Sequence, residues 1–192
     1  LVLGICLNDA ENAAKPNQIE EWRRDMLPPS PGPCLAKLLR RSAFLSAVYR
    51  GWGARAAHRG FLRYYQRIYD PGYSGWTYFR VSIKKFQRVC ADRHVPFLAV
   101  ILPLMNDPFD QGRYRFEFAH AAIRGVLDAN GVAHLDALDA FRGKNSLRMT
   151  AIPVLDPHPN EIAHRIIAET LLDGLLTCGY LPKEYRLADC KA

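Results

Sequence analysis

Apolar and polar residues follow one another in blocks along the chain, and the blocks predict strands separated by helices. Residues 1–7 are a continuous apolar run closed by Asn8 and Asp9, which is typical of a strand buried on both faces. Residues 95–102 form a second such run, and a shorter run at residues 132–136 predicts a third strand. The chain therefore has three candidate core strands that lie far apart in the sequence.

Around these strands, apolar residues recur every three or four positions, as they do on the inward face of a helix. One helix is predicted over residues 113–130, with Gly131 as its C-terminal stop. Another begins near Ser74, and a third runs from Pro159 to about Thr177. The expected inward residues of the first two helices are Phe116, Ala119, Ile123 and Val126, and Trp76, Phe79, Ile83, Phe86 and Cys90.

Strands that alternate with helices predict a parallel sheet covered on both faces, that is, a three-layer α/β/α domain. Ligands of such sheets bind beyond the carboxyl ends of the strands. Asn8 follows the first strand and the loop with Asp156 and His158 follows the third, so both are expected at one rim. Three strands make a thin sheet, and the chain starts inside its first strand. We therefore expect further N-terminal strands outside these 192 residues.

Residues 1–192 are expected to form a single α/β domain with a helical insert at residues 28–74. The insert opens with a Pro-rich stretch and continues with apolar residues at helical spacing, among many arginines. Two interpretations stay open. The insert is either a lid or surface-docking element, or a pair of amphipathic helices packed on the rest of the domain.

The formal net charge is +7, and the excess lies between Arg23 and Arg88. A basic surface suits an anionic lipid, nucleic acid or acidic polymer, but it is also the ordinary solvated face of helices. The five cysteines are scattered without a C-x-x-C pair, which indicates neither a disulfide framework nor a zinc site. No apolar run reaches the ~20 residues of a membrane-spanning helix, so no transmembrane segment is expected. Compartment and oligomeric state stay open.

The clearest candidate for chemistry is Asp156-Pro157-His158, at the start of the last predicted helix. A carboxylate and an imidazole in a proline-stiffened loop meet the requirements of a general base and its orienting group. The helix N-terminus disfavours the imidazolium and Asp156 favours it, which suits a histidine that accepts a proton and returns it. The alternative is an ordinary Pro-rich helix start with an exposed histidine.

Three segments together resemble the SGNH (GDSL-type) hydrolase superfamily. The run from Val2 to Asn8-Asp9 resembles the family's apolar strand that ends in Asn-Asp, and residues 95–103 resemble its central strand flanked by prolines. Residues 156–160, Asp-Pro-His-Pro-Asn, are similar to the family's last block and are the most specific of the three. The resemblance runs along the whole chain and implies the flavodoxin-like SGNH fold.

The resemblance also implies roles for individual residues. His158 would be the general base that takes the proton from a nucleophilic serine, and Asp156 would hold the imidazole in the right tautomer. Asn8 would offer its side-chain amide to the oxyanion of the tetrahedral intermediate. Asn160 and His164 are expected to be structural, as a brace of the loop and a residue on the helix.

The chain departs from the family pattern at three places. Cys6 stands where the family has glycine, and Asp156 and His158 are separated by one residue rather than two. No Gly-Asp-Ser block occurs in the chain, and Ser74, which has glycine on one side, is expected to cap a helix. We expect the nucleophile to precede Leu1, so that these 192 residues alone would be inactive or nearly so.

The resulting hypothesis is an SGNH-type serine ester hydrolase that cleaves an acyl or acetyl ester through an acyl-enzyme. No metal or organic cofactor is expected, since the chain has no Cys/His cluster, H-E-x-x-H motif or Gly-rich phosphate loop. The substrate would be a small-molecule, glycan or lipid acyl ester, and nucleic acid is not expected as a partner. Two alternatives stay open: an acyltransferase on the same fold, and a non-catalytic binding module that uses the basic residues 37–67.

Overall fold

The computed structural model divides into two compact units. The first unit comprises residues 1–9 and 79–192, and the second comprises residues 10–78. The second unit contains the whole predicted insert, while the prediction of one domain over the entire chain stays a prediction. The structure describes residues 1–11, 30–105, 107–109, 113–152 and 156–182.

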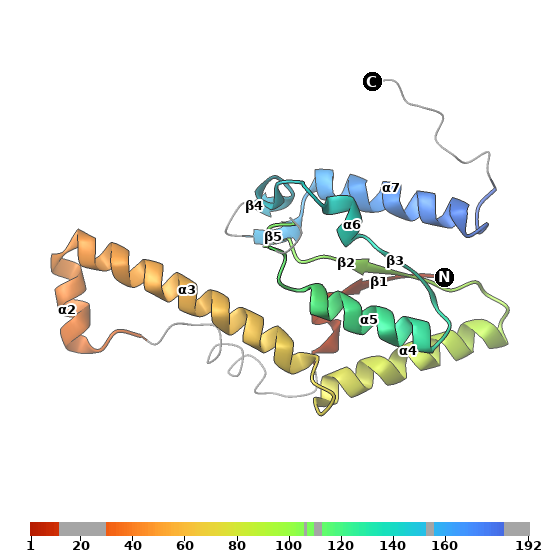
Figure 1. The fold of residues 1–192 in the computed structure, drawn as a ribbon, viewed down its shortest axis with the longest axis horizontal. Helices are drawn as coiled ribbons and strands as arrows, with labels where there is room; N and C mark the ends of the chain where they lie inside the picture. The colour runs from red at the N-terminus through yellow and green to blue at the C-terminus, as the bar shows by residue number, and fades with distance from the viewer. Residues whose placement is uncertain (12–29, 106, 110–112, 153–155, 183–192) are drawn as a thin grey trace, which may run out of the picture. The chain divides into compact units, whose positions relative to one another are not determined.

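The first unit is built on a three-stranded parallel sheet with the order β1-β2-β3 (Figure 1). Its register pairs Val2 with Leu98 and Leu98 with Ala133. The sheet confirms the predicted α/β class and the three predicted strands. Their bounds are β1 (Val2–Cys6), β2 (Leu98–Leu102) and β3 (Ala133–Asp136).

The central strand β2 is buried, whereas β1 is more exposed than its apolar sequence predicts. On β1, Ile5 is buried but Val2 is 43% exposed. The expectation of a first strand buried on both faces is therefore wrong, because β1 is an edge strand among the described strands. The backbone N–H of Cys6 donates to the Asp9 carboxylate at 2.8 Å, so this side chain caps the end of the strand.

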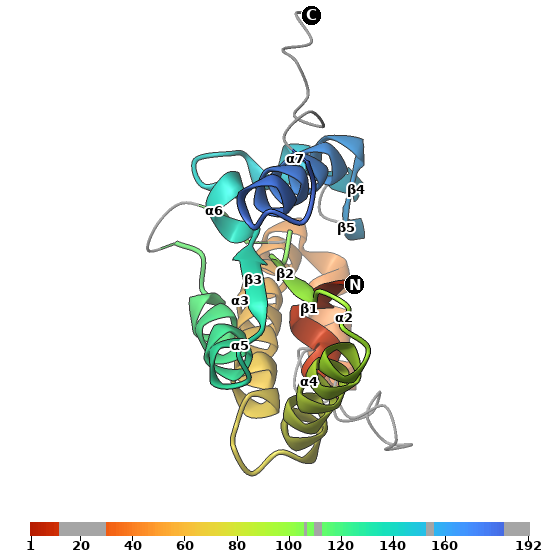
Figure 2. The same cartoon turned by 90° about the vertical axis from the view of Figure 1, so that its right-hand side faces the viewer.

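Helices lie on both faces of the sheet, as the two views of the ribbon show (Figures 1 and 2). On one face are α5 (Glu117–Ala129) and the part of α4 (Ser74–Asp92) that belongs to this unit. On the other face is α7 (Glu161–Thr177), next to the short α6 (Leu138–Phe141). This layering agrees with the predicted α/β/α arrangement, and the SGNH fold itself stays a prediction.

The predicted inward faces of α5 and α4 are largely the buried ones. Phe116, Ala119 and Ile123 are buried, and Gly131 takes a left-handed φ of 62° just beyond α5, as expected for a C-terminal stop. Two predicted inward residues are not buried: Phe86 of α4 is 44% exposed and Val126 of α5 is half-buried. Hydrophobic spacing therefore located both helices and misassigned one residue on each.

A two-stranded antiparallel sheet precedes α7 where the sequence predicts only a loop. It consists of β4 (Thr150–Ile152) and β5 (Asp156–Pro159), and Thr150 pairs with Pro159. The helix begins at Glu161 rather than at Pro159, so that prediction is wrong by two residues. The reason is Asn160, whose side-chain oxygen caps the helix by accepting bonds from Ile162 N–H and Ala163 N–H, both at 3.1 Å.

The second unit contains α2 (Pro33–Arg41) and the 26-residue α3 (Ala43–Ile68). The break between them falls at Ser42, whose hydroxyl accepts a hydrogen bond from Leu45 N–H at 3.2 Å and caps α3. Helix α3 continues through Gly60 without a break. A glycine in a helix costs only about 1 kcal/mol, which the burial of Tyr64 and Ile68 offsets.

In the described part of the chain, no helix combines the length and apolar character that a membrane crossing requires. The predicted absence of a transmembrane segment agrees with this finding.

Candidate functional site

Asp156 and His158 lie side by side on β5 and form a direct hydrogen-bonded pair. The imidazole Nδ1 of His158 lies 2.5 Å from Asp156 Oδ1, and the backbone N–H of His158 donates to the same oxygen at 3.0 Å. The imidazole and the backbone N–H of His158 thus both contact the Asp156 carboxylate. This double contact sets the orientation of the imidazole relative to the carboxylate.

The pair is open to solvent and has one unused nitrogen. The side chain of His158 is 83% exposed and that of Asp156 is 41% exposed. The backbone N–H of His158, followed by its imidazole, lowers the pKa of the Asp156 carboxyl below its ordinary value. A carboxylate accepting at Nδ1 selects the tautomer with the proton there, which leaves Nε2 as an acceptor. Among the described residues, Nε2 has no hydrogen-bond partner.

Asn160 fixes the end of β5 that carries this pair. Its side-chain amide donates to Arg148 O at 2.9 Å and to Thr150 O at 3.2 Å, while its oxygen caps α7. The same residue therefore joins β4, β5 and the helix. This geometry agrees with its predicted role as a brace. His164 lies exposed on α7, as a residue of the helix surface.

Asn8 lies in a short 3-10 helix (Leu7–Ala10) directly after β1, and it is exposed. Leu7 in this turn is fully buried. Burial raises the pKa of Asp9 above its ordinary value, although the hydrogen bond from Cys6 N–H opposes the change. Asp9 thus caps the turn after β1. The Asn8 amide faces solvent without a hydrogen-bond partner in the described residues.

Asn8 and the Asp156–His158 pair lie toward the same end of the sheet. In Figure 1, β1 and β2 run toward the side on which β4 and β5 are found. The structure joins Asp156 to His158 directly. Within the described ranges, no hydrogen bond joins Asn8 to either of them.

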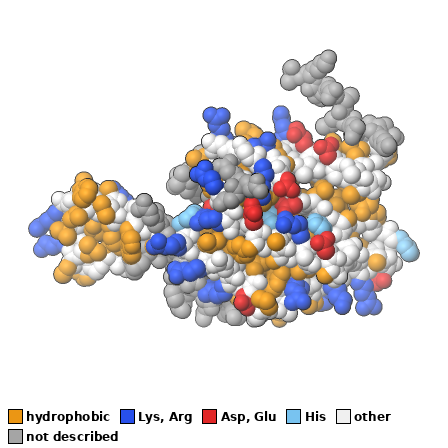
Figure 3. All heavy atoms as spheres, in the orientation of Figure 1, with side chains coloured by type: hydrophobic (Ala, Val, Ile, Leu, Met, Phe, Trp, Pro, Cys, Tyr) orange, Lys and Arg blue, Asp and Glu red, His pale blue; other side chains and the backbone are white. Residues whose placement is uncertain are grey.

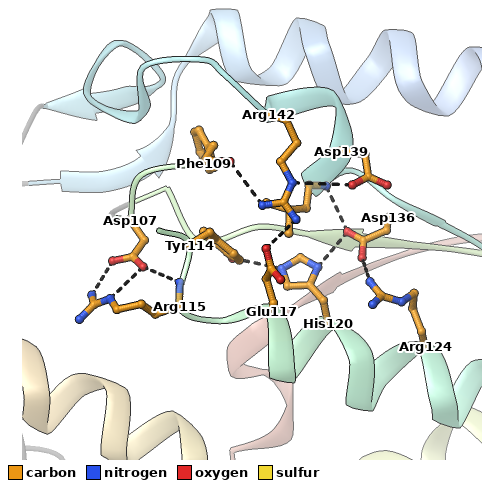
Figure 4. A network of polar contacts seen from close by, with 11 residues as sticks. Asp107, Phe109, Tyr114, Arg115, Glu117, His120, Arg124, Asp136, Asp139 and Arg142 are labelled. Atoms are coloured by element: carbon orange, nitrogen blue, oxygen red, sulfur yellow. Dashed lines mark hydrogen bonds and ion pairs between the residues drawn. The ribbon is translucent and has the colours of Figure 1, made fainter. Parts of the chain in front are cut away.

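A second Asp–His pair, which the sequence reasoning missed, lies at the carboxyl end of β3 (Figure 4). His120 Nδ1 lies 2.8 Å from Asp136 Oδ1, and His120 Nε2 lies 3.1 Å from the hydroxyl of Tyr114. Leu104 N–H donates to the same hydroxyl at 2.9 Å. The whole imidazole is buried, with both ring nitrogens engaged.

The Asp136 carboxylate, at the end of β3, accepts hydrogen bonds from several donors. Burial alone would raise its pKa, but the hydrogen bond and charge of His120, Leu138 N–H and Arg124 together lower it below its ordinary value. The Leu138 bond measures 3.1 Å, and Arg124 pairs with the other carboxylate oxygen. Asp136 is therefore a charged anchor that joins β3, α5 and the start of α6.

A polar cavity of about 220 Å³ adjoins this network. It is lined in part by Glu117, Asp139 and Arg142. Arg142 pairs with Glu117 at 2.8 Å and donates to Phe109 O at 3.4 Å. Because these charges neutralise one another and His120 has no free nitrogen, we interpret the cluster as structural. A signal for it was available, since His120 falls four residues after Phe116 on the predicted inward face of α5.

No three His, Cys, Asp or Glu side chains of the described residues gather closely enough to hold a metal ion. The expectation of a site without metal or cofactor stays a prediction.

In comparisons with protein-family models, with curated proteins and with solved structures, no match to the chain was found. The resemblance to SGNH hydrolases therefore rests on the three sequence segments alone.

Proposed function

We propose that this chain carries the base half of the active site of an SGNH-type serine ester hydrolase. The observation that carries the proposal is the Asp156–His158 pair, with 2.5 Å between carboxylate and Nδ1 and with Nε2 open to solvent. A general base needs an oriented imidazole and one nitrogen free to accept a proton. His158 has both, whereas His120 has no nitrogen to spare.

The proposed reaction assigns one step to each residue. A serine hydroxyl adds to the carbonyl carbon of the ester while its proton passes to His158 Nε2. The Asn8 amide donates to the resulting oxyanion, and Asp156 stabilises the imidazolium. The C–O bond to the alcohol then breaks, the alcohol leaves with the proton from Nε2, and water repeats the sequence to release the acid.

The nucleophile is proposed to come from a segment outside these 192 residues. The serines of the described residues have other roles where their contacts are known. Ser42 caps α3, and Ser46 donates to Leu39 O at 2.6 Å within the second unit. Ser74 is the first residue of α4, and its predicted role as the cap of that helix stays a prediction.

The test compares two proteins on p-nitrophenyl acetate: the 192-residue chain and the full-length product of its gene. The full-length protein should turn over the ester and label with a fluorophosphonate at a serine before Leu1, while the 192-residue chain should do neither. His158→Ala in the full-length protein should lower kcat/KM about 10³-fold or more, because the base is removed.

His164→Ala is the matched control, since it removes another exposed histidine six residues away in the same unit. It should leave kcat/KM unchanged. Equal activity of His158→Ala and the parent protein would refute the assignment, as would a full-length product without a serine that labels.

A second substitution tests the oxyanion role. Asn8→Ala should lower kcat about 100-fold with little change in KM, because the amide acts only on the charge of the transition state. The capping carboxylate of Asp9 remains in this variant, so the turn after β1 should persist. A rise in KM with unchanged kcat would instead place Asn8 in ground-state binding.

A further inference from the structure

The second unit presents an unusual set of exposed apolar side chains on two helices, which we term the docking face. Its members are Leu35 (40% exposed), Leu38 (51%), Phe44 (74%), Val48 (54%) and Trp52 (47%). Helix α2 has no buried residue at all, although four of its nine residues are leucine or alanine and a fifth is proline. Packing among the described residues therefore leaves this apolar surface exposed.

The charges that α2 and α3 themselves carry all have one sign. Residues 26–69 contain no aspartate or glutamate. Six exposed cations of α2 and α3 form no ion pair with the described residues. They are Lys37, Arg40, Arg41, Arg50, Arg59 and Arg63. A positive field of this density favours an anionic partner.

Helical geometry places the apolar and cationic groups on one continuous strip of α3. Phe44, Val48 and Trp52 are four residues apart and so lie on one side of the helix. The same side continues to Arg59 and Arg63, which are four residues apart further along. Figure 3 shows hydrophobic side chains gathered over α2 and the first part of α3, with Lys and Arg at the margin.

Exposed apolar side chains beside many cations favour one class of partner over the others. A nucleic acid would neutralise the cations but would leave leucine and valine in water. An apolar protein groove would cover the leucines but would offer no anionic partners to so many cations. The interface of an anionic bilayer accepts both, because acyl chains cover Phe, Trp and Leu while lipid phosphates meet Lys and Arg.

We propose that the docking face binds peripherally to anionic lipid bilayers, with Phe44, Val48 and Trp52 at the boundary of headgroups and acyl chains. Lys37, Arg40 and Arg41 contact lipid phosphates. The inference does not depend on the proposed ester hydrolase, because it uses no residue of that site.

The experiment uses the 192-residue chain and vesicles of phosphatidylcholine, with and without phosphatidylglycerol. Cosedimentation should show binding to the anionic vesicles, weaker binding at high salt, and little binding to phosphatidylcholine alone. The triple variant Lys37→Gln/Arg40→Gln/Arg41→Gln should weaken binding about 100-fold, since each cation near the surface contributes a factor of about five.

A matched control variant has the same net charge as this triple variant but carries its three substitutions in the first unit. Lys84→Gln/Arg93→Gln/Arg165→Gln removes three exposed cations there and should leave vesicle binding unchanged. Comparable losses in the two triple variants would show a response to net charge alone and would overturn the proposal.

The apolar contribution needs its own variant. Phe44→Ser/Val48→Ser should weaken binding about tenfold or more while circular dichroism stays the same, because both side chains are exposed in the free protein. The emission of Trp52 should shift to the blue on binding and should be quenched by brominated lipid, and Trp52→Phe should remove that part of the signal.

Three results would overturn the proposal. The first is no binding to anionic vesicles. The second is binding that the serine variants leave intact, which would indicate a purely electrostatic site. The third is a dimer in solution that Phe44→Ser/Val48→Ser dissociates, which would assign the docking face to a second copy of the chain.

Discussion

Two hydrogen-bonded Asp–His pairs in the described part of the chain use the same atoms in opposite surroundings. In both, a carboxylate oxygen contacts the imidazole Nδ1, at 2.8 Å for Asp136–His120 and at 2.5 Å for Asp156–His158. The His120 side chain is fully buried, whereas that of His158 is 83% exposed. The second ring nitrogen is bound to Tyr114 in the first pair and lacks a partner among the described residues in the other.

The difference shows that distance between a carboxylate and an imidazole does not by itself define a catalytic pair. A buried and fully bonded imidazole stabilises the fold, because moving its proton would break a network closed on both sides. An exposed imidazole with one free nitrogen contributes little to stability but can exchange a proton with a ligand. We therefore expect the buried pair to matter for stability and the exposed pair to matter for reactivity.

The largest expected effect is the loss of stability in His120→Ala. This change leaves the Tyr114 hydroxyl and the Asp136 carboxylate without their shared partner and opens a cavity in the core. The free energy of unfolding in urea should fall by about 3 kcal/mol. His158→Ala is the matched control and should leave it unchanged within error. Similar losses in both variants would contradict the distinction between the pairs.

The next largest effect is on the decline of the free energy of unfolding at acid pH, to which Asp136 contributes. The pKa of Asp136 is lowered by folding, so its contribution is complete above its ordinary pKa of 3.8 and is lost as pH falls through the lower folded value. Asp136→Asn should lower the free energy of unfolding by about 2 kcal/mol at neutral pH and flatten its decline below pH 4.

The pKa of Asp156 is lowered as well, and the sign of its effect is the same. Solvent screens this exposed carboxylate, so Asp156→Asn should change the decline at acid pH far less than Asp136→Asn. The measurement is thermal or urea unfolding of both variants across the acid range. A larger change in Asp156→Asn would reverse the comparison.

The smallest expected effect is a difference in the rate at which histidines are chemically labelled in the protein without substitutions. Diethyl pyrocarbonate reacts with neutral imidazole, so His158 should react as fast as the exposed His164, while His120 should react only as the protein opens. Peptide mass spectrometry separates the three sites. Fast reaction of His120 under native conditions would show that the buried pair is accessible after all.

Much of the first unit could be predicted from apolar periodicity. The runs at residues 1–7, 95–102 and 132–136 became β1, β2 and β3, because a strand in a parallel sheet needs a continuous apolar run. The strands β4 and β5 were not predicted, since Asp156 to Pro159 contains two prolines and no apolar residue other than these. Their pairing depends on Asn160, which bonds to backbone oxygens ten and twelve residues away.

The sequence by itself determined the α/β class and singled out Asp156 and His158, because residues two apart meet through local geometry alone. Only the tertiary structure could bring together His120 and Asp136, which are 16 residues apart and lie on a helix and a strand. The tertiary structure also decided which imidazole is buried and which keeps a free nitrogen. Exposure depends on the packing of distant segments, and no local pattern of residues records it.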